Sequence, residues 1–203
     1  IHQRPNAAGD NAQWTRGGAD TGANYSQCSE ITPNDATDYV ESNTANQIDD
    51  YELEATPAAL ESTDTINVVM VGCRAAVSDA TGGDPDIVLR IKSASGGTVE
   101  ESASLDCNST TWASPAPLPA NRNYQLVLYD LPGASTTGWS KSTLDTAQIG
   151  VREAVTDLHF ARVSTIWLSV DHKPGGAAPS SIIHPVLGNE EIEGAMFGGQ
   201  VVR

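Results

Sequence analysis

The chain has 203 residues, a length that suits one all-β domain of ordinary size with extensions. Its composition is 39% hydrophobic with 18 glycines and 11 prolines, which favours many short strands joined by turns and disfavours a helical bundle. The formal net charge of -15 arises from 26 acidic and 11 basic residues. Because phosphate backbones are bound by clusters of Lys and Arg, and no two basic residues are adjacent here, this charge argues against direct contact with nucleic acid.

Hydropathy argues against a membrane partner as well. No apolar run approaches the roughly 20 residues that a membrane-spanning helix needs, and the N-terminus lacks the charged and then apolar pattern of a secretory signal. A strongly acidic protein is repelled by anionic surfaces, so we expect its partners to offer basic or apolar patches.

Residues 1–45 form the first region of the chain. They are rich in Gly, Asn, Asp and Thr, and such a composition cannot bury enough apolar surface to fold alone. We therefore predict an extended N-terminal arm that docks on its own domain or on a neighbour. Its expected anchors, and its candidate partner-binding residues, are Trp14 and Tyr25.

Residues 46–173 carry short β-type runs bounded by turn formers, and they predict a single β-sandwich domain. The run at residues 66–77 begins apolar on both faces, as in a strand that is covered on both sides. Residues 86–92 alternate, which predicts one buried face of Ile and Leu and a second face that is largely in water. Further strands are expected at residues 124–129, 149–151 and 160–171.

The second half of this domain carries one helix signal and the clearest strand pattern. Ser140 is a suitable N-cap for a helix of one or two turns, which would place Leu144 against the sheet beside Trp139. In the strand at residues 160–171 we expect Ile166, Leu168 and Val170 on one face and Val163, Thr165 and Trp167 on the other.

Residues 174–203 are broken too often by Gly and Pro to form packed elements of normal length, yet they carry many apolar side chains. We predict an extended C-terminal arm that adds an edge strand or fills a groove on another chain. The alternative is that this segment wraps its own domain. Its candidate partner-binding residues are Ile182, Ile183, Val186, Leu187, Ile192, Met196, Phe197, Val201 and Val202.

The cysteines and histidines suggest no catalytic, cofactor or metal site. The three cysteines match no zinc-binding spacing; Cys73 is expected to be a buried, inert thiol, and Cys28 and Cys107 stay open as a disulfide pair. The four histidines lie far apart, and we expect His159 and His172 at the surface near the ends of a strand.

Hydrolase and calcium patterns are also lacking. The chain has no Gly-x-Ser-x-Gly elbow, and residues 34–38 offer oxygen ligands without the spacing of a calcium loop. Adjacent carboxylates on a strand point to opposite faces, so we interpret the acidic pairs as solvated surface charge. These pairs are Asp49-Asp50, Glu100-Glu101 and Glu190-Glu191.

Four blocks of the sequence, covering about residues 39–172, resemble a recurrent β-sandwich protein of tailed bacteriophages that is encoded among head and tail structural genes. The last two blocks are the most specific. The blocks are Ile66-Asn67-Val68-Val69 through Arg74-Ala75; residues 87–92 with Gly96-Gly97-Thr98; Thr137-Gly138-Trp139-Ser140 with Leu144-Asp145 and residues 148–151; and residues 161–171. The resemblance implies a jelly-roll-like sandwich with a role in building the virion and with no catalytic residues.

Together these features predict an all-β, antiparallel, jelly-roll-like β-sandwich with one short helix and two extended arms. The expected function is non-enzymatic: a structural protein on the exterior of a tailed-phage head or tail, most simply a capsid decoration protein. Its partners would be major capsid or tail subunits and copies of itself, with no cofactor. The alternative is a tail-associated or glycan-binding module in which Trp14 or Trp112 stacks on sugar rings.

Overall fold

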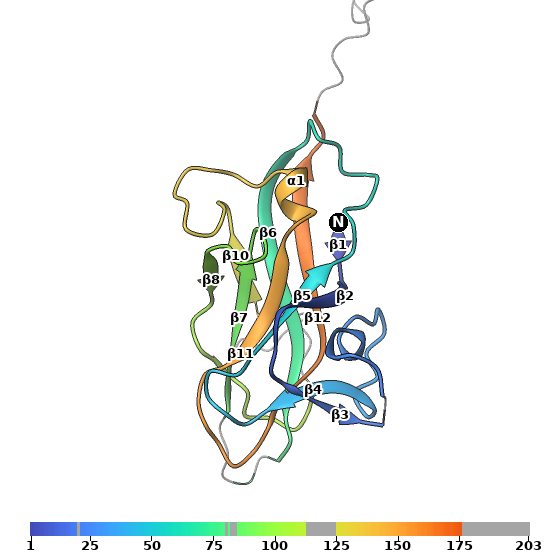
Figure 1. Cartoon of the computed structure of the whole chain (residues 1–203), viewed down its shortest axis with the longest axis vertical. Coiled ribbons are helices and arrows are strands. Elements are labelled where there is room, and N and C mark those ends of the chain that lie inside the picture. Colours follow the sequence, from blue (N-terminus) through green and yellow to red (C-terminus); the bar gives the residue numbers. More distant parts are fainter. Residues whose placement is uncertain (20, 80, 82–84, 113–124, 176–203) are drawn as a thin grey trace, which may run out of the picture.

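The computed structural model describes residues 1–19, 21–79, 81, 85–112 and 125–175. Two sheets pack face to face, and every described strand pair is antiparallel (Figure 1). Sheet A contains β1 (His2–Gln3), β3 (Thr15–Gly18), β4 (Asp38–Ser42), β6 (Thr65–Val77), β10 (Gln125–Leu128) and β12 (Ala161–Lys173). Sheet B contains β2 (Pro5–Ala12), β5 (Ile48–Leu53), β7 (Asp86–Lys92), β8 (Val99–Glu101), β9 (Leu105–Asp106) and β11 (Gln148–Glu153). The all-β sandwich expected from the sequence is confirmed.

Eight of these strands follow jelly-roll connectivity. Taken in chain order, the first pairs with the last (β4 with β12), the second with the seventh (β5 with β11), the third with the sixth (β6 with β10) and the fourth with the fifth (β7 with β8). This nesting is what results when one long hairpin is rolled into two facing sheets. It agrees with the jelly-roll-like sandwich predicted above.

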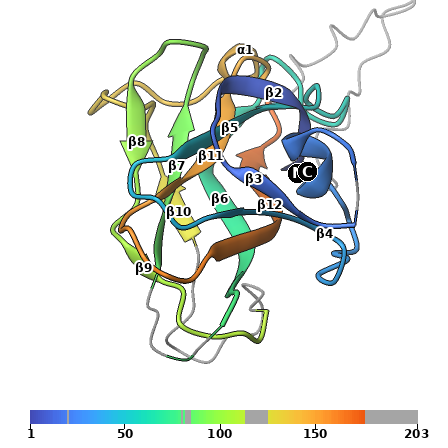
Figure 2. The ribbon, with the colours of Figure 1, turned by 60° about the horizontal axis from the view of Figure 1, so that its bottom comes forward.

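The N-terminal segment docks on its own domain. β1 pairs with β12, β2 extends sheet B beside β5, and β3 extends sheet A beside β4 (Figure 2). A 3₁₀ turn, η1 (Asn24–Gln27), follows these strands. Added strands of this kind protect the edges of both sheets, which would otherwise present unpaired backbone groups.

The predicted anchors of this segment serve the domain itself. Trp14 is only 3% exposed, and its indole N–H donates to the carbonyl of Gln47 at 3.0 Å. Tyr25 is partly buried and packs against the same core. Because Trp14 is enclosed by its own chain, its assignment as a residue that binds a neighbouring subunit is corrected.

The core lies between the sheets and is built from the alternating inward residues of the long strands. Val69 and Val71 of β6, Ile149 of β11, and Ile166 and Leu168 of β12 have no exposed surface. Burying one such side chain contributes about 1.5–3 kcal/mol, so these strands supply much of the stability of the sandwich.

The outward face of β7 is not in water, contrary to the expectation from its alternating pattern. Val88, Arg90 and Lys92 are 4%, 6% and 3% exposed. The prediction fails because the N-terminal segment reaches this face, where Asp10 of β2 forms an ion pair with Lys92. Alternation along one strand cannot reveal a covering segment that comes from another part of the chain.

A β-bulge changes the predicted faces of β12. The pairing register with β6 shifts between Val163 and Thr165, so one residue is inserted between the two halves of the strand. Val163 therefore points into the core together with Ile166, and both have no exposed surface. The expectation that Val163 shares the outward face with Trp167 is wrong for this reason.

The short helix is confirmed as α1 (Lys141–Leu144). Ser140 is its N-cap: its hydroxyl accepts the Thr143 N–H at 3.3 Å, and the Thr143 hydroxyl accepts the Ser140 N–H at 2.9 Å. This capping box fixes the start of the helix and places Leu144 in the core. With four residues each, α1 and η1 are far too short to cross a bilayer. No other helix in the described part of the chain is long enough to do so.

The predicted C-terminal arm beyond Gly175 lies outside the described residues. The arm's nine candidate partner-binding residues, from Ile182 to Val202, all belong to this part of the chain.

Candidate functional site

The outer face of sheet A carries two adjoining hollows, which together we call the sheet A groove. Their volumes are about 330 and 410 Å³, within the range of about 300–1,000 Å³ that small-ligand sites occupy. His2, Met70 and Ser169 border both hollows. The first hollow is also lined by Ile1, Val68, Val127, Tyr129, Val170 and Asp171, and the second by Arg4, Ile31, Pro33, Arg74, Gln125, Thr165 and Trp167.

The register of four strands brings these side chains together. Met70 lies opposite Val127 of β10 on one side and Ser169 of β12 on the other, and Ser169 in turn pairs with His2 of β1. Outward residues in one register row of an antiparallel sheet are neighbours, so residues distant in sequence share a single surface.

In the next row Gly72 lies between Gln125 and Trp167. An ideal Cβ on Gly72 would lie 2.6 Å from Cζ2 and 2.7 Å from Cε2 of Trp167. The indole therefore covers the glycine and occupies the space that any larger residue would need. The absence of a side chain at Gly72 thus lets a Trp ring form the floor of the second hollow.

Basic side chains surround this ring. Arg74 forms a bidentate ion pair with Asp35, in which Nη2 donates to Oδ2 at 2.6 Å and Nε donates to Oδ1 at 2.9 Å. Arg4 donates through Nη1 to the carbonyl of Glu30 and to the hydroxyl of Thr165. Within the described residues Arg4 forms no ion pair, since no carboxylate oxygen lies within 4 Å of it.

Large apolar side chains are exposed along both hollows. Val127 is 48% exposed, Tyr129 70% and Ile31 83%. Because they cluster beside a hollow instead of standing singly, they mark a surface suited to binding.

A second polar cluster lies on the outer face of sheet B, and its central side chains, those of Asp50, Arg90 and Lys92, are buried. Asp50 contacts both Arg90 (Nε to Oδ1, 3.2 Å) and Lys92 (Nζ to Oδ2, 3.0 Å). Further ion pairs link Lys92 to Asp10 and both Arg90 and Arg152 to Glu101. The three cations and three carboxylates balance, as burial of charge requires. Arg90 contacts Asp50 and Glu101 as ion pairs, but the geometry of its Nε and Nη1 groups does not meet the requirements of a hydrogen bond.

Asp10 ties this cluster to the β7–β8 turn. It accepts the Gly96 N–H at 2.7 Å and the Ser95 hydroxyl at 2.6 Å, and it pairs with Lys92. The Gly96 N–H and then the Lys92 ammonium hold the pKa of Asp10 well below its usual range. The cluster is a structural brace, because its charged groups are satisfied by one another.

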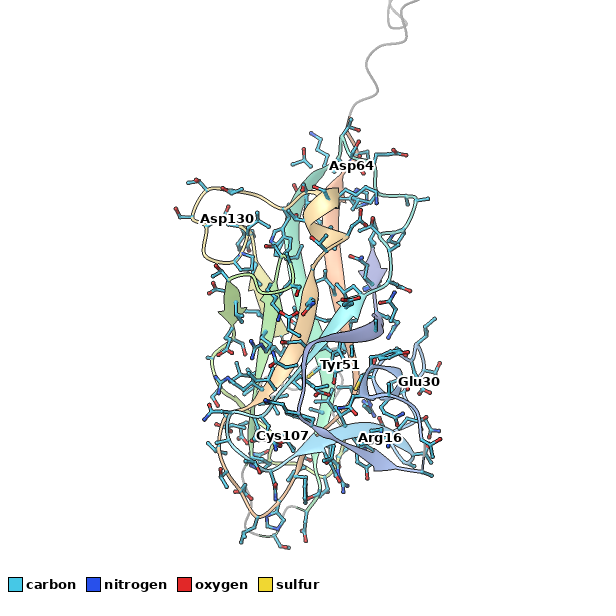
Figure 3. The ribbon with its side chains drawn as sticks, in the orientation of Figure 1. Arg16, Glu30, Tyr51, Asp64, Cys107 and Asp130 are labelled. Atoms are coloured by element: carbon cyan, nitrogen blue, oxygen red, sulfur yellow. The ribbon has the colours of Figure 1, made fainter. Side chains whose placement is uncertain are left out.

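A third cluster surrounds Asp49 in the interior near the N-terminal segment. Its carboxylate accepts the Trp14 N–H at 3.1 Å, the Asn24 amide at 2.7 Å and the Tyr51 hydroxyl at 3.0 Å. Figure 3 labels Tyr51 inside the sandwich. Burial raises the pKa of Asp49 to about 6, against the opposing effect of these hydrogen bonds. The cluster holds Trp14 and Asn24 on β5.

Glu153 at the end of β11 has no exposed surface, and neither of its side-chain oxygens forms a well-aligned hydrogen bond within the described residues. Burial raises the pKa of Glu153 to about 8, and the nearby negative charges of Asp86 and Asp157 add to the shift. The backbone N–H groups of Val155 and Asp86 oppose part of it. Glu153 is therefore a protonated, buried acid at neutral pH.

The acidic pair Asp49-Asp50 is not solvated surface charge. Both residues are at most 1% exposed, and the prediction is wrong because Asn24 and Arg90, far away in sequence, supply their partners. The expectation that adjacent carboxylates face opposite ways holds, since Asp49 points into the sandwich and Asp50 outward.

The cysteines and other candidate ligands are accounted for by structure. All three cysteines are buried thiols, and Cys28 and Cys107 do not form a disulfide. Asp35, in the segment weighed for calcium, pairs with Arg74 instead. Among the described residues, no group of three or more His, Cys, Asp or Glu is arranged to hold a metal ion.

The two tryptophans considered for sugar stacking are not free platforms. Trp14 is buried, and Trp112 packs on Tyr39 with ring centroids 5.8 Å apart at 54°. The tryptophan that lies in a hollow is Trp167, which sequence reasoning assigned only to a strand face. The alternation of β12 placed Trp167 on an outward face, but it could not show that Gly72 of the neighbouring strand β6 lies beneath the ring.

Comparison with known proteins assigns no family: no protein-family model matches the chain, and the search of curated proteins gives no match either. The sheet A groove combines a hollow, an aromatic floor and polar side chains, which are features that ligand-binding sites share. Fold alone does not define function, so the site has to carry the interpretation.

Proposed function

We propose that the chain is a structural, non-enzymatic protein on the exterior of a tailed-phage virion, with capsid decoration as its first role. One observation carries the proposal. The β-sandwich completes both of its sheets with its own N-terminal strands, and the apolar C-terminal segment begins at one end of this sandwich. The ion pair between Asp10 and Lys92 ties β2 to the ion cluster around Asp50. Jelly rolls with bodies of this kind are a recurrent architecture of viral structural proteins.

The C-terminal segment supplies the contact with neighbours in this proposal. Gly175 donates its N–H to Asp64 at 2.8 Å, at the end of the sandwich where Asp64 is labelled in Figure 3. Beyond it, residues 176–203 contain nine large apolar side chains that need a surface on which to be buried. Extended segments of this kind bind by adding a strand or filling a groove on a capsid or tail subunit, or on another copy of the chain.

Charge and copy number support the same role. The net charge of -15 favours solubility at high copy number and disfavours contact with packaged DNA. Many weak contacts on one particle add through multivalency, so each copy needs only a modest interface.

The direct test is the composition of purified particles. Virions of the phage that encodes the chain are analysed by mass spectrometry and labelled with gold-conjugated antibodies against the purified protein. The proposal expects the chain in stoichiometric amounts and gold on the particle exterior. Virions that lack the chain, or a purified chain that turns over a substrate, would overturn it.

A matched pair of full-length variants tests the contact. Ile192→Asp with Phe197→Asp introduces two charges at apolar positions, whereas Ser180→Asp with Ser181→Asp introduces the same charges at polar positions. We expect the first pair to abolish incorporation into particles and the second pair to retain it, with unchanged circular dichroism in both. Equal incorporation of the two pairs would exclude the C-terminal segment as the anchor.

A further inference from the structure

The second hollow of the sheet A groove has the features of a ligand site that assembly does not require. Its floor is the indole of Trp167, placed over Gly72, and its volume is about 410 Å³. A Trp ring is a large and rigid apolar face with one N–H donor at its edge, which suits a ligand that is both apolar on one side and polar around its rim.

Unused donors surround this floor. Within the described residues, neither the side-chain amide of Gln125 nor the Nε1–H of Trp167 has a hydrogen-bond partner, and both residues line the hollow. Arg4 uses only Nη1 for its contacts, so its remaining N–H groups are available. Donors that converge on an aromatic floor fix the orientation of a small polar ligand.

Charge defines the ligand more closely. The second hollow is bordered by His2, Arg4 and Arg74 and by no acidic residue, in a chain with 26 acids and 11 bases. The Arg74 charge is shared with Asp35. Arg4, in contrast, has no ion pair within 4 Å among the described residues and is influenced only by the more distant charge of Glu54. A guanidinium fork matches the geometry of a carboxylate, so the hollow is complementary to a single anionic group.

We infer that the second hollow of the sheet A groove binds a carboxylate-bearing saccharide, with a sugar ring on Trp167 and its carboxylate on Arg4. A pyranose ring presents a face of C–H groups to the indole and hydroxyls to Gln125 and to the Trp167 N–H. An extended polyanion such as nucleic acid fits less well, because it would need a run of cations and would meet the acidic remainder of the surface. The inference stands independently of the assembly role.

The experiment titrates the full-length protein with galacturonic acid, which carries a single carboxylate, and with galactose, its neutral counterpart. Isothermal calorimetry measures affinity, and the indole N–H resonances in NMR spectra report which Trp is involved. We expect saturable binding of the acidic sugar, a shift of the Trp167 resonance, and binding of the neutral sugar that is about ten- to hundredfold weaker, as expected when one charged hydrogen bond is lost.

Variants separate the two contacts. Arg4→Gln should reduce affinity for galacturonic acid about ten- to hundredfold and leave the affinity for galactose unchanged, whereas Trp167→Ala should abolish the binding of both sugars. Trp112→Ala, which removes a Trp outside the groove, is the control and should bind normally. The NMR shift of the unaltered protein keeps the test decisive if a variant folds poorly.

Three results would overturn the inference. One is equal affinity for the acidic and neutral sugars, and another is binding that leaves the Trp167 resonance unmoved. The third is the absence of saccharide binding together with binding of a synthetic peptide of residues 186–203, which would assign the groove to the C-terminal segment of a second copy.

Discussion

The Nε of Arg90, on β7, lies 3.2 Å from Oδ1 of Asp50, on β5, although strand β11 runs between these two strands. The contact crosses Gly150, which pairs with Asp50 on one side and with Arg90 on the other. An ideal Cβ at Gly150 would lie 2.7 Å from Asp50 Oδ1 and 2.2 Å from the carbonyl oxygen of Asp49. The glycine thus provides the space in which two charged side chains meet across a strand.

Gly150→Ala should therefore destabilise the protein by about 2–4 kcal/mol, since the methyl group displaces Asp50 and strains the backbone of β5. The measurement is the midpoint of urea unfolding. Gly138→Ala is the matched control, because nothing lies within 4 Å of its ideal Cβ, and it should shift stability by less than about 0.5 kcal/mol. Equal effects of the two substitutions would contradict this role of Gly150.

Asp50→Ala tests the ion cluster itself. Removing the shared carboxylate leaves Arg90 and Lys92 buried with weakened compensation, which costs about 3–5 kcal/mol in comparable buried pairs. Asp171→Ala, at an exposed position that contacts only the Asn67 amide, should cost less than about 1 kcal/mol. A small loss for Asp50→Ala in urea unfolding would mean that water replaces the carboxylate and that the cluster is not a brace.

Local pattern was sufficient for most of the strands and for the helix. The apolar run of β6 and the Ser140 capping signal depend on neighbours along the chain, so their positions could be predicted without a partner in view. The jelly-roll topology was reached through family resemblance and not through periodicity. The bulge in β12 could not be predicted, because it is set by pairing with β6.

The candidate site depends on long-range pairing and was missed for that reason. Trp167 becomes a floor only because Gly72, on another strand, has no side chain. Asp49 and Asp50 resemble surface acids until Asn24, Arg90 and Lys92 are brought to them. The sequence pointed to Trp14 and Trp112 for sugar stacking, whereas the tryptophan that lines a hollow is Trp167.

The thiols provide a probe of unfolding. Cys28, Cys73 and Cys107 have no exposed surface, and burial raises the pKa of Cys28 to about 12, so little of the reactive thiolate exists in the folded state. A thiol-specific reagent such as dithionitrobenzoate should label none of them in the native protein and all three in urea. Rapid labelling without denaturant would show that the sandwich opens more readily than its packing implies.

Glu153 makes stability depend on pH in a direction opposite to that of an ion-paired acid. Its pKa is about 8 in the folded chain against an ordinary value of 4.5, so between these values the folded state holds a proton that the unfolded state has released. Stability therefore falls as pH rises from about 4.5 to about 8. Asp49, with its pKa raised to about 6, acts in the same direction over a narrower window.

Glu153→Gln replaces the protonated acid by a neutral group of similar shape and removes this titration. Above pH 8 the variant should be more stable than the unaltered protein, by an amount on the order of a few kcal/mol, because it has no buried charge to accommodate. Below pH 4.5 the difference should vanish, since the acid is then protonated in both states. Urea unfolding at a series of pH values measures both limits, with Glu100→Gln, at an exposed acid of β8, as the control. A stability difference that does not change with pH would show that Glu153 is ionised in the fold and has a counter-charge.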